Sequence, residues 1–264
     1  MHVNKLFSVQ YPLILPVFKN AIIILMRQLS VFILIVLFFS SKAQDAAITD
    51  SLLSPKDQSW TYLGFSLGGS ANSAYIEHTA FTVNLVADYT IRANAGVVLR
   101  HFPDHRKGIL NTGLQMSLNY AQKGWTQEFF TLPGQSATTN LDYLNLPVEA
   151  IIYAGKPANR IYINLGLYAE MLVNYSAAVA PDSLGVIEDF YTYQDSRDKR
   201  FGYGLKAGAG FQKEFNFGAL YLEAYFAYSL SNFINSEILA SEIPDLSNLY
   251  TIGVNVGYLI SLSP

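Results

Sequence analysis

The 264-residue sequence contains no cysteine, which excludes disulfides, thiolate metal sites and a cysteine-linked lipid anchor. Charged residues are also scarce, at 14% of the chain against roughly 25% in soluble domains. Long apolar runs occur only before Ser40, although 51% of all residues are hydrophobic. Because a bundle of membrane-spanning helices needs several runs of about 20 apolar residues, that class is excluded too.

The N-terminal segment has the features of a secretory signal. The apolar stretch Leu29–Phe39 follows Met26-Arg27 and precedes Ser41-Lys42-Ala43. A basic start, a short apolar core and a small-x-small ending are typical of a signal peptide, and translation can begin at Met26. The rival interpretation is a retained membrane helix over Ile22–Phe39, which Arg27 interrupts. We expect residues 1–43 to be the signal, 44–59 a flexible periplasmic lead and 60–264 the folded domain.

Beyond that signal the chain is acidic. Its 13 basic residues are the 17 of the whole sequence less Lys5, Lys19, Arg27 and Lys42, and they face 20 acidic residues, for a formal charge of −7. Nucleic-acid binding needs a basic surface that neutralises phosphates, so nucleic acid is excluded as a partner.

The rest of the chain alternates apolar residues with small or polar ones. In Tyr250–Ile260 the even-numbered residues are apolar or aromatic, and most of the odd-numbered ones are small or polar. An alternation of period two places each class on one face of a β-strand. Eight such strands are predicted: Trp60–Gly68, Tyr89–Phe102, Ile109–Trp125, Leu141–Tyr153, Arg160–Tyr175, Phe201–Lys213, Ala219–Leu230 and Leu249–Leu262.

The gaps between these strands alternate between long and short. The first, third, fifth and seventh gaps have about 20, 15, 25 and 18 residues. The others are turn-like: Pro103–Gly108, Ala154–Asn159 and Glu214–Gly218. Outer-membrane barrels have tight turns at the periplasmic end and long loops at the outer end. The pattern predicts an all-β, eight-stranded antiparallel transmembrane up-and-down β-barrel in the bacterial outer membrane, with both termini periplasmic.

The two faces of Phe201–Lys213 indicate which side of this barrel meets lipid. One face carries Gly202, Gly204, Gly208 and Gly210, and the other is apolar with aromatic ends. A secreted lipocalin-type barrel, the alternative, has its apolar side chains inside and no need for glycines on its wet exterior. Glycines suit the narrow lumen of an eight-stranded barrel, where other groups approach closely. We therefore expect the apolar face to contact outer-membrane lipid.

Four short motifs follow one another in a fixed order: Tyr120–Gly124, Tyr143–Pro147, Gly202–Gly210 and, more loosely, Tyr225–Asn232. In this order they resemble the PorT-like outer-membrane β-barrel proteins of Bacteroidota, and the agreement covers nearly the whole predicted domain. The resemblance implies the barrel fold and the outer-membrane location. The namesake of that family is associated with protein secretion across the outer membrane, so the resemblance also suggests a secretion or envelope protein as partner.

Six charged residues are expected to point into the lumen, and their charges balance. Because a lone buried charge costs several kcal/mol, the simplest interpretation is a structural cluster of salt bridges. The functional alternative is a narrow polar path or a small binding cavity. From their positions in neighbouring strands, we expect Glu170 and Lys206 to pair directly. The six residues are Arg92, Arg100, Glu149, Glu170, Lys206 and Glu223.

The histidines do not suggest a catalytic or metal site. His78 has Glu77 beside it and Ser73 nearby, but adjacent residues of a strand point to opposite faces, so no catalytic triad forms. His101 and His105 lie at the first short turn, too far away to share a metal ion with His78. We therefore predict no catalytic residues, no metal and no cofactor.

The sequence as a whole predicts a non-enzymatic outer-membrane barrel with a structural or interaction role. An accessory subunit of an outer-membrane protein secretion assembly is the alternative, and a barrel hydrolase ranks third. Aromatic residues of the outer loops either pack at the membrane interface or form a contact surface for a partner. These aromatic residues are Trp125, Phe129, Phe130, Phe190, Tyr191 and Tyr193.

Overall fold

A computed structural model describes residues 60–78, 83–103, 110–128, 136–156, 158–180, 193–235 and 246–262. The predicted signal peptide and periplasmic lead lie outside these residues, as do His105, Phe129, Phe130, Phe190 and Tyr191, and those expectations stay predictions. Among the described residues, no helix is long and apolar enough to cross a membrane.

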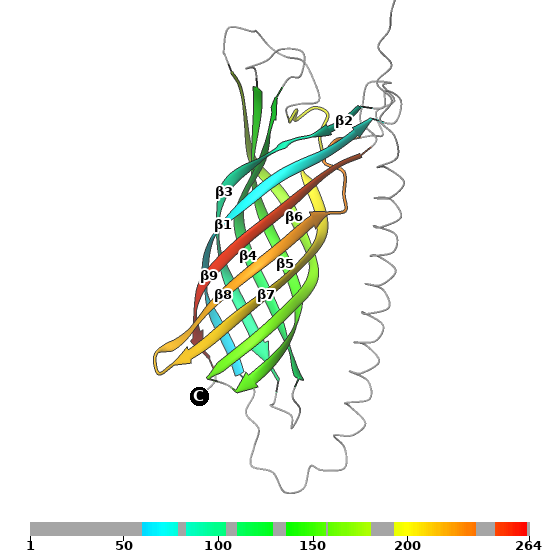
Figure 1. The fold of residues 1–264 in the computed structure, drawn as a ribbon. Coiled ribbons are helices and arrows are strands. Elements are labelled where there is room, and N and C mark those ends of the chain that lie inside the picture. The colour runs from blue at the N-terminus through cyan, green and yellow to red at the C-terminus, as the bar shows by residue number, and fades with distance from the viewer. Residues whose placement is uncertain are drawn as a thin grey trace, which may run out of the picture. The chain divides into compact units, whose positions relative to one another are not determined.

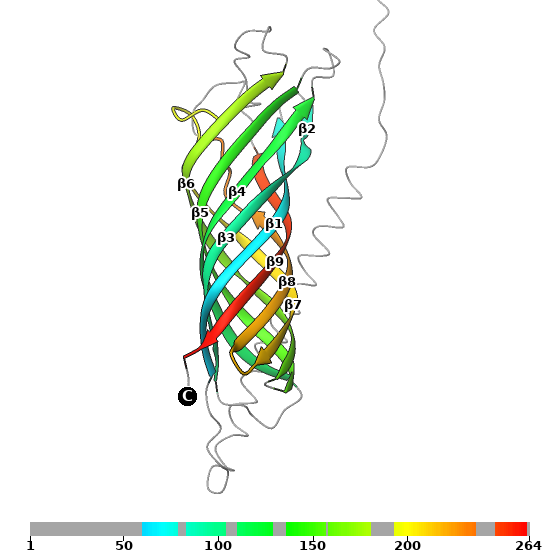
Figure 2. The ribbon, with the colours of Figure 1, turned by 90° about the vertical axis from the view of Figure 1, so that its left-hand side faces the viewer.

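Nine strands form one antiparallel sheet that closes on itself (Figures 1 and 2). β1 pairs with β3, each strand from β3 to β8 pairs with the next one, and β9 returns to pair with β1, so eight strands form the ring. The short β2 pairs only with the end of β1. The strands are β1 (Trp60–His78), β2 (Val83–Val86), β3 (Asp88–Phe102), β4 (Leu110–Glu128), β5 (Ser136–Lys156), β6 (Asn159–Ala180), β7 (Phe201–Phe215), β8 (Gly218–Ser229) and β9 (Leu246–Ser261).

The structure confirms the predicted eight-stranded up-and-down barrel and lengthens several of its strands. β1 continues to His78, β5 begins at Ser136 and β6 continues to Ala180, so part of each long gap is strand. The segment between the first two predicted strands contains β2, which forms a hairpin arm with the end of β1. We call the end of the barrel with the short turns the turn end, and the opposite end the loop end.

The outer surface of the ring is apolar on all eight strands. Val254 is 48% exposed and Ile91 84% exposed, and both point away from the lumen. A continuous apolar surface of this extent belongs against lipid rather than water. Outward apolar residues on the other strands include Phe65, Leu118, Leu146, Ile163, Phe211 and Leu222.

The inner face of β7 shows why its glycines are needed. A Cβ atom added to Gly210 would lie 2.5 Å from the hydroxyl oxygen of Tyr162, and one added to Gly204 would lie 2.5 Å from that of Tyr168. Both tyrosines are buried side chains of β6, which pairs with β7. The glycines of β7 therefore make room for large side chains of the neighbouring strand, as the sequence predicted.

Strands β4, β5 and β6 continue beyond the apolar surface as a three-stranded extension (Figure 2). Its outer face is polar: Gln122 and Asn174 both donate hydrogen bonds to the carboxylate of Asp142, at 3.3 and 3.0 Å. The hydroxyls of Thr126 and Thr138 lie 2.9 Å apart nearer the tip. This change from apolar to polar side chains marks where the lipid-facing surface ends.

An arginine placed on the lipid-facing surface tests this assignment. We expect Val254→Arg to destabilise the barrel in a bilayer by about 2–4 kcal/mol, because the charge must enter hydrocarbon. Ala178→Arg is the matched control, since Ala178 is an exposed residue of the extension. Urea titration of the protein in liposomes gives both values. Equal, small effects at the two positions would contradict a lipid-facing Val254.

Candidate functional site

At the turn end, the lumen is closed by an aromatic layer around one arginine. Arg160 is 2% exposed, and its guanidinium lies 4.5 Å from the ring centre of Phe102 and 5.6 Å from that of Tyr153. It donates a hydrogen bond of 3.2 Å to the Tyr62 hydroxyl, which donates one of 3.0 Å to Glu214. Cation–π contacts and this relay stabilise a charge that would otherwise be costly to bury.

The next layer is a network of charged and amide side chains. Lys206 lies 3.1 Å from a carboxylate oxygen of Glu149 and 3.3 Å from one of Glu223. Glu223 also binds Arg100 at 3.2 Å, so two cations share two anions. All four side chains are buried, and four polar neighbours complete their hydrogen bonds. These neighbours are Gln115, Tyr162, Asn164 and Gln212.

A second ion pair lies nearer the loop end, and it corrects one prediction. Glu170 binds Lys123 at 2.6 Å and accepts a hydrogen bond of 3.2 Å from Asn145, so its partner is not Lys206. In the register of β6 and β7, Lys206 lies opposite Gly166, while Glu170 lies opposite Gly202. The prediction placed the end of β6 near Tyr175, and the longer strand puts the two residues four positions apart.

The structure brings five of the six predicted lumen charges into these two clusters. Arg92 is the exception: it points inward at a higher level and binds the side-chain oxygen of Asn140. The prediction missed two buried cations, Lys123 and Arg160. The alternation of β4 that turns Gln115 inward also turns Lys123 inward, so the signal was present in the sequence.

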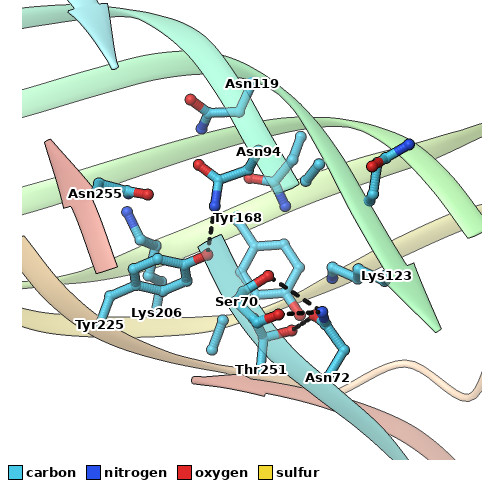
Figure 3. Close-up of a pocket in the computed structure, with 14 residues that line it drawn as sticks. Ser70, Asn72, Asn94, Asn119, Lys123, Tyr168, Lys206, Tyr225, Thr251 and Asn255 are labelled. Carbon is cyan, nitrogen blue, oxygen red and sulfur yellow. Dashed lines mark hydrogen bonds between the residues drawn. The ribbon is translucent and has the colours of Figure 1, made fainter. Parts of the chain in front are cut away.

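A small polar cavity of about 40 Å³ lies between the two clusters (Figure 3). Lys206 lines one part of it and Lys123 another. Asn94 donates a hydrogen bond to Tyr225 at 3.2 Å across the cavity wall, and the buried Tyr168 hydroxyl has no partner in the described part of the chain. A cavity of this size and polarity holds a few water molecules, and it is too small for a metabolite.

At the loop end, buried apolar residues cover the lumen, and we call them the lid cluster. The indole of Trp125 packs on Phe233, with ring centres 5.0 Å apart. Two segments outside the ring strands meet here, because Asp198 and Ile234 form an isolated β-bridge. Trp125 and Tyr193, predicted as loop aromatics, therefore pack inside the structure. The lid cluster consists of Ala74, Ile76, Ala87, Trp125, Leu141, Tyr143, Leu172, Tyr193, Phe233, Ile234 and Leu249.

The histidine and acidic side chains of the described chain form no group that could hold a metal ion. His101 lies on the outer surface of β3, where one ring nitrogen is 2.9 Å from the Thr61 hydroxyl. The side chain of His78 is outside what the structure describes. Each buried glutamate of the described lumen lies within 3.3 Å of a lysine or an arginine.

A closed ring of eight strands, an apolar exterior and a packed polar lumen define an integral β-barrel of the outer membrane. Residues 54–235 match the model of a family described as outer membrane protein beta-barrel domain. The chain belongs to this family, and it is an outer-membrane protein. No curated protein has significant sequence similarity to it.

Solved structures similar to this chain are also bacterial barrels. Ail, the attachment invasion locus protein of Yersinia pestis, is 13% identical, with a TM-score of 0.34 over 75% of this chain and 98% of Ail. The N-terminal β-barrel domain of Pseudomonas aeruginosa OprF is 14% identical, with a TM-score of 0.32 over 74% and 97%. Neisserial surface protein A is 12% identical, with a TM-score of 0.33 over 74% and 96%.

A double-mutant cycle tests the observed ion pairing. We expect Glu170→Gln alone to cost about 3–5 kcal/mol, because it leaves Lys123 buried without its anion. Glu170→Gln with Lys123→Met should cost less than the sum of the two single changes. Glu170→Gln with Lys206→Met should be additive within about 0.5 kcal/mol, because these two side chains do not touch. Unfolding in detergent gives each free energy. Strong coupling between Glu170 and Lys206, without coupling between Glu170 and Lys123, would contradict the observed register of β6 and β7.

Proposed function

We propose that this protein is a sealed, non-enzymatic barrel that serves a structural or interaction role at the outer membrane. The observation that carries the proposal is the filling of the lumen from both ends, by the aromatic layer and ion network below and the lid cluster above. In this proposal the turn end and both termini face the periplasm, and the loop end faces outward. Labelling of a cysteine at Ser196 in intact cells tests that orientation.

The charge network favours a seal over a conduit. A conducting lumen needs a continuous wet path, whereas the side chains of Arg100, Glu149 and Glu223 are almost fully inaccessible to water. Their hydrogen-bonding groups are bound to one another, so an ion would have to break several charge-assisted bonds to pass. Because the carboxylates of Glu149 and Glu223 are held in these ion pairs, they are not available as a general acid or base, and we propose no catalytic role for them.

The extension of β4, β5 and β6 supports an interaction role. β7 pairs with β6 only as far as Met171, so among the described strands β6 has a partner on one side only from Val173 to Ala180. Natural edge strands are usually blunted by charge or proline, and residues 173–180 contain neither. Such an edge suits an extended segment of a partner protein, which would add to the sheet as a fourth strand.

The alternative function is an accessory subunit of an outer-membrane protein secretion assembly. The resemblance to PorT-like proteins and the open edge of β6 both favour it. Co-purification after mild detergent extraction separates the two proposals. A stable partner protein that is lost from Ala178→Lys, with its added edge charge, and kept by the exposed control Ser196→Lys would favour the assembly. A lone monomer would favour the autonomous barrel.

Conductance in planar bilayers tests the seal. We expect the protein to show no sustained channel, because the aromatic layer, the ion network and the lid cluster all block its lumen. Phe233→Ala opens a space in the lid cluster but leaves the ion network in place, so it should also stay closed. Single-channel recording in concentrated potassium chloride measures both proteins. A stable open level in the unaltered protein would overturn the proposal, and a channel in Phe233→Ala alone would show that the ion network is not a seal.

A further inference from the structure

The outer surface carries a hollow of about 530 Å³ at the loop end of β7, β8 and β9. β7 begins at Phe201 and β8 ends at Ser229, whereas the neighbouring β6 continues to Ala180. The barrel wall is therefore lower on this side, and the residues that follow β8 turn across the top of the step. The hollow lies at this step, on the outside of the barrel, and has no connection with the roles proposed for the lumen.

One side of the hollow is apolar and belongs to the lipid-facing surface. Phe201 is 71% exposed and Tyr203 59% exposed, and Leu230 and Leu246 are exposed beside them. Further from the loop end, β8 and β9 present the exposed side chains of Phe226 and Ile252. The hollow is thus continuous with the region that lipid acyl chains occupy, and aromatic rings at its edge suit the membrane interface.

The other side of the hollow is polar and already ordered by hydrogen bonds. The Ser231 hydroxyl accepts a bond of 3.0 Å from the backbone N–H of Tyr203, and the Asn248 amide donates one of 3.0 Å to the Ser229 carbonyl. These bonds hold the chain after β8 against the neighbouring strands. A ligand would therefore meet a wall that is formed before it binds.

Lys199 supplies the positive charge of the hollow. Within the described chain it has no carboxylate partner, unlike its neighbours. Arg197 binds Asp198 at 2.6 Å, and Arg200 binds Asp195 at 2.7 Å. Hydrogen bonding to Arg200 lowers the pKa of Asp195. Asp195 and Arg200 are therefore both ionised at neutral pH, and their opposite charges cancel. Among the described residues that line the hollow, Lys199 is the one that carries a charge.

We propose that this hollow binds a phosphate-bearing lipid of the leaflet at the loop end, with the phosphate at Lys199 and an acyl chain along Phe201 and Leu230. An amphiphile matches both sides of the hollow at once, at the depth where headgroups meet acyl chains. A lone lysine gives little affinity for a free anion in water, whereas the apolar contacts and membrane anchoring add to it. A soluble peptide would leave Phe201 and Tyr203 in contact with lipid, so it fits less well.

Native mass spectrometry of the full barrel in detergent tests the proposal, with two probes that share acyl chains. We expect dioleoyl-phosphatidylglycerol to bind at one saturable site, and dioleoylglycerol, which lacks the phosphate, to bind much less. Lys199→Gln should weaken phosphatidylglycerol binding about tenfold, the value of one charge-assisted hydrogen bond. Lys213→Gln is the matched control, because Lys213 is an exposed lysine at the other end of β7. This control should bind like the unaltered protein.

Three results would overturn the proposal. Equal loss in Lys199→Gln and Lys213→Gln would mean that lipid adheres by overall charge. Equal binding of the two probes would mean that the phosphate is not recognised. Displacement by millimolar inorganic phosphate would identify a free-anion site in place of a lipid site. Heat-modified migration on gels checks that each variant is folded, and Leu230→Ser, which removes an acyl contact and keeps the charge, should weaken both probes.

Discussion

The rest of the structure depends on the sharing of two glutamates by one lysine and one arginine inside a closed ring. Glu149 and Glu223 lie within 3.3 Å of Lys206, and Glu223 also binds Arg100. An eight-stranded ring is too narrow to leave these charges in bulk water, so each must be paired or neutralised. The four charges come from β3, β5, β7 and β8, so all of them are paired only when these strands are in the observed register.

The side chains that fill the lumen differ from one end of the barrel axis to the other. Aromatic rings around Arg160 close the turn end. The small polar cavity lies between the ion network and the loop end, which the apolar side chains of the lid cluster close. The binding roles proposed above therefore lie outside the lumen: a partner protein at the edge of β6, and a lipid at the step beside Lys199. This division explains how a filled barrel can still have a role in binding.

The sequence predicted the parts of this structure that local alternation determines. Alternation located all eight ring strands, and the glycines of β7 identified the lumen side because only their small size fits beside Tyr162 and Tyr168. It did not determine which charges pair, since that depends on strand register, and a few residues of extra strand moved Glu170 away from Lys206. The lid cluster was unpredictable for a different reason: residues 193–200 and 231–235 have no periodicity, and they acquire their place only when Trp125, Phe233 and Ile234 pack together.

The seal can be measured most directly through the cavity between the ion pairs. Ser70 lines this cavity and is buried, and the chain has no natural cysteine, so Ser70→Cys gives a single thiol within the lumen. The protein is reconstituted in liposomes and treated from either side with a small charged methanethiosulfonate. If the lumen is sealed, the thiol will not be modified until the barrel is unfolded. Rapid modification of the folded protein from one side would show an open aqueous path and contradict the sealed barrel.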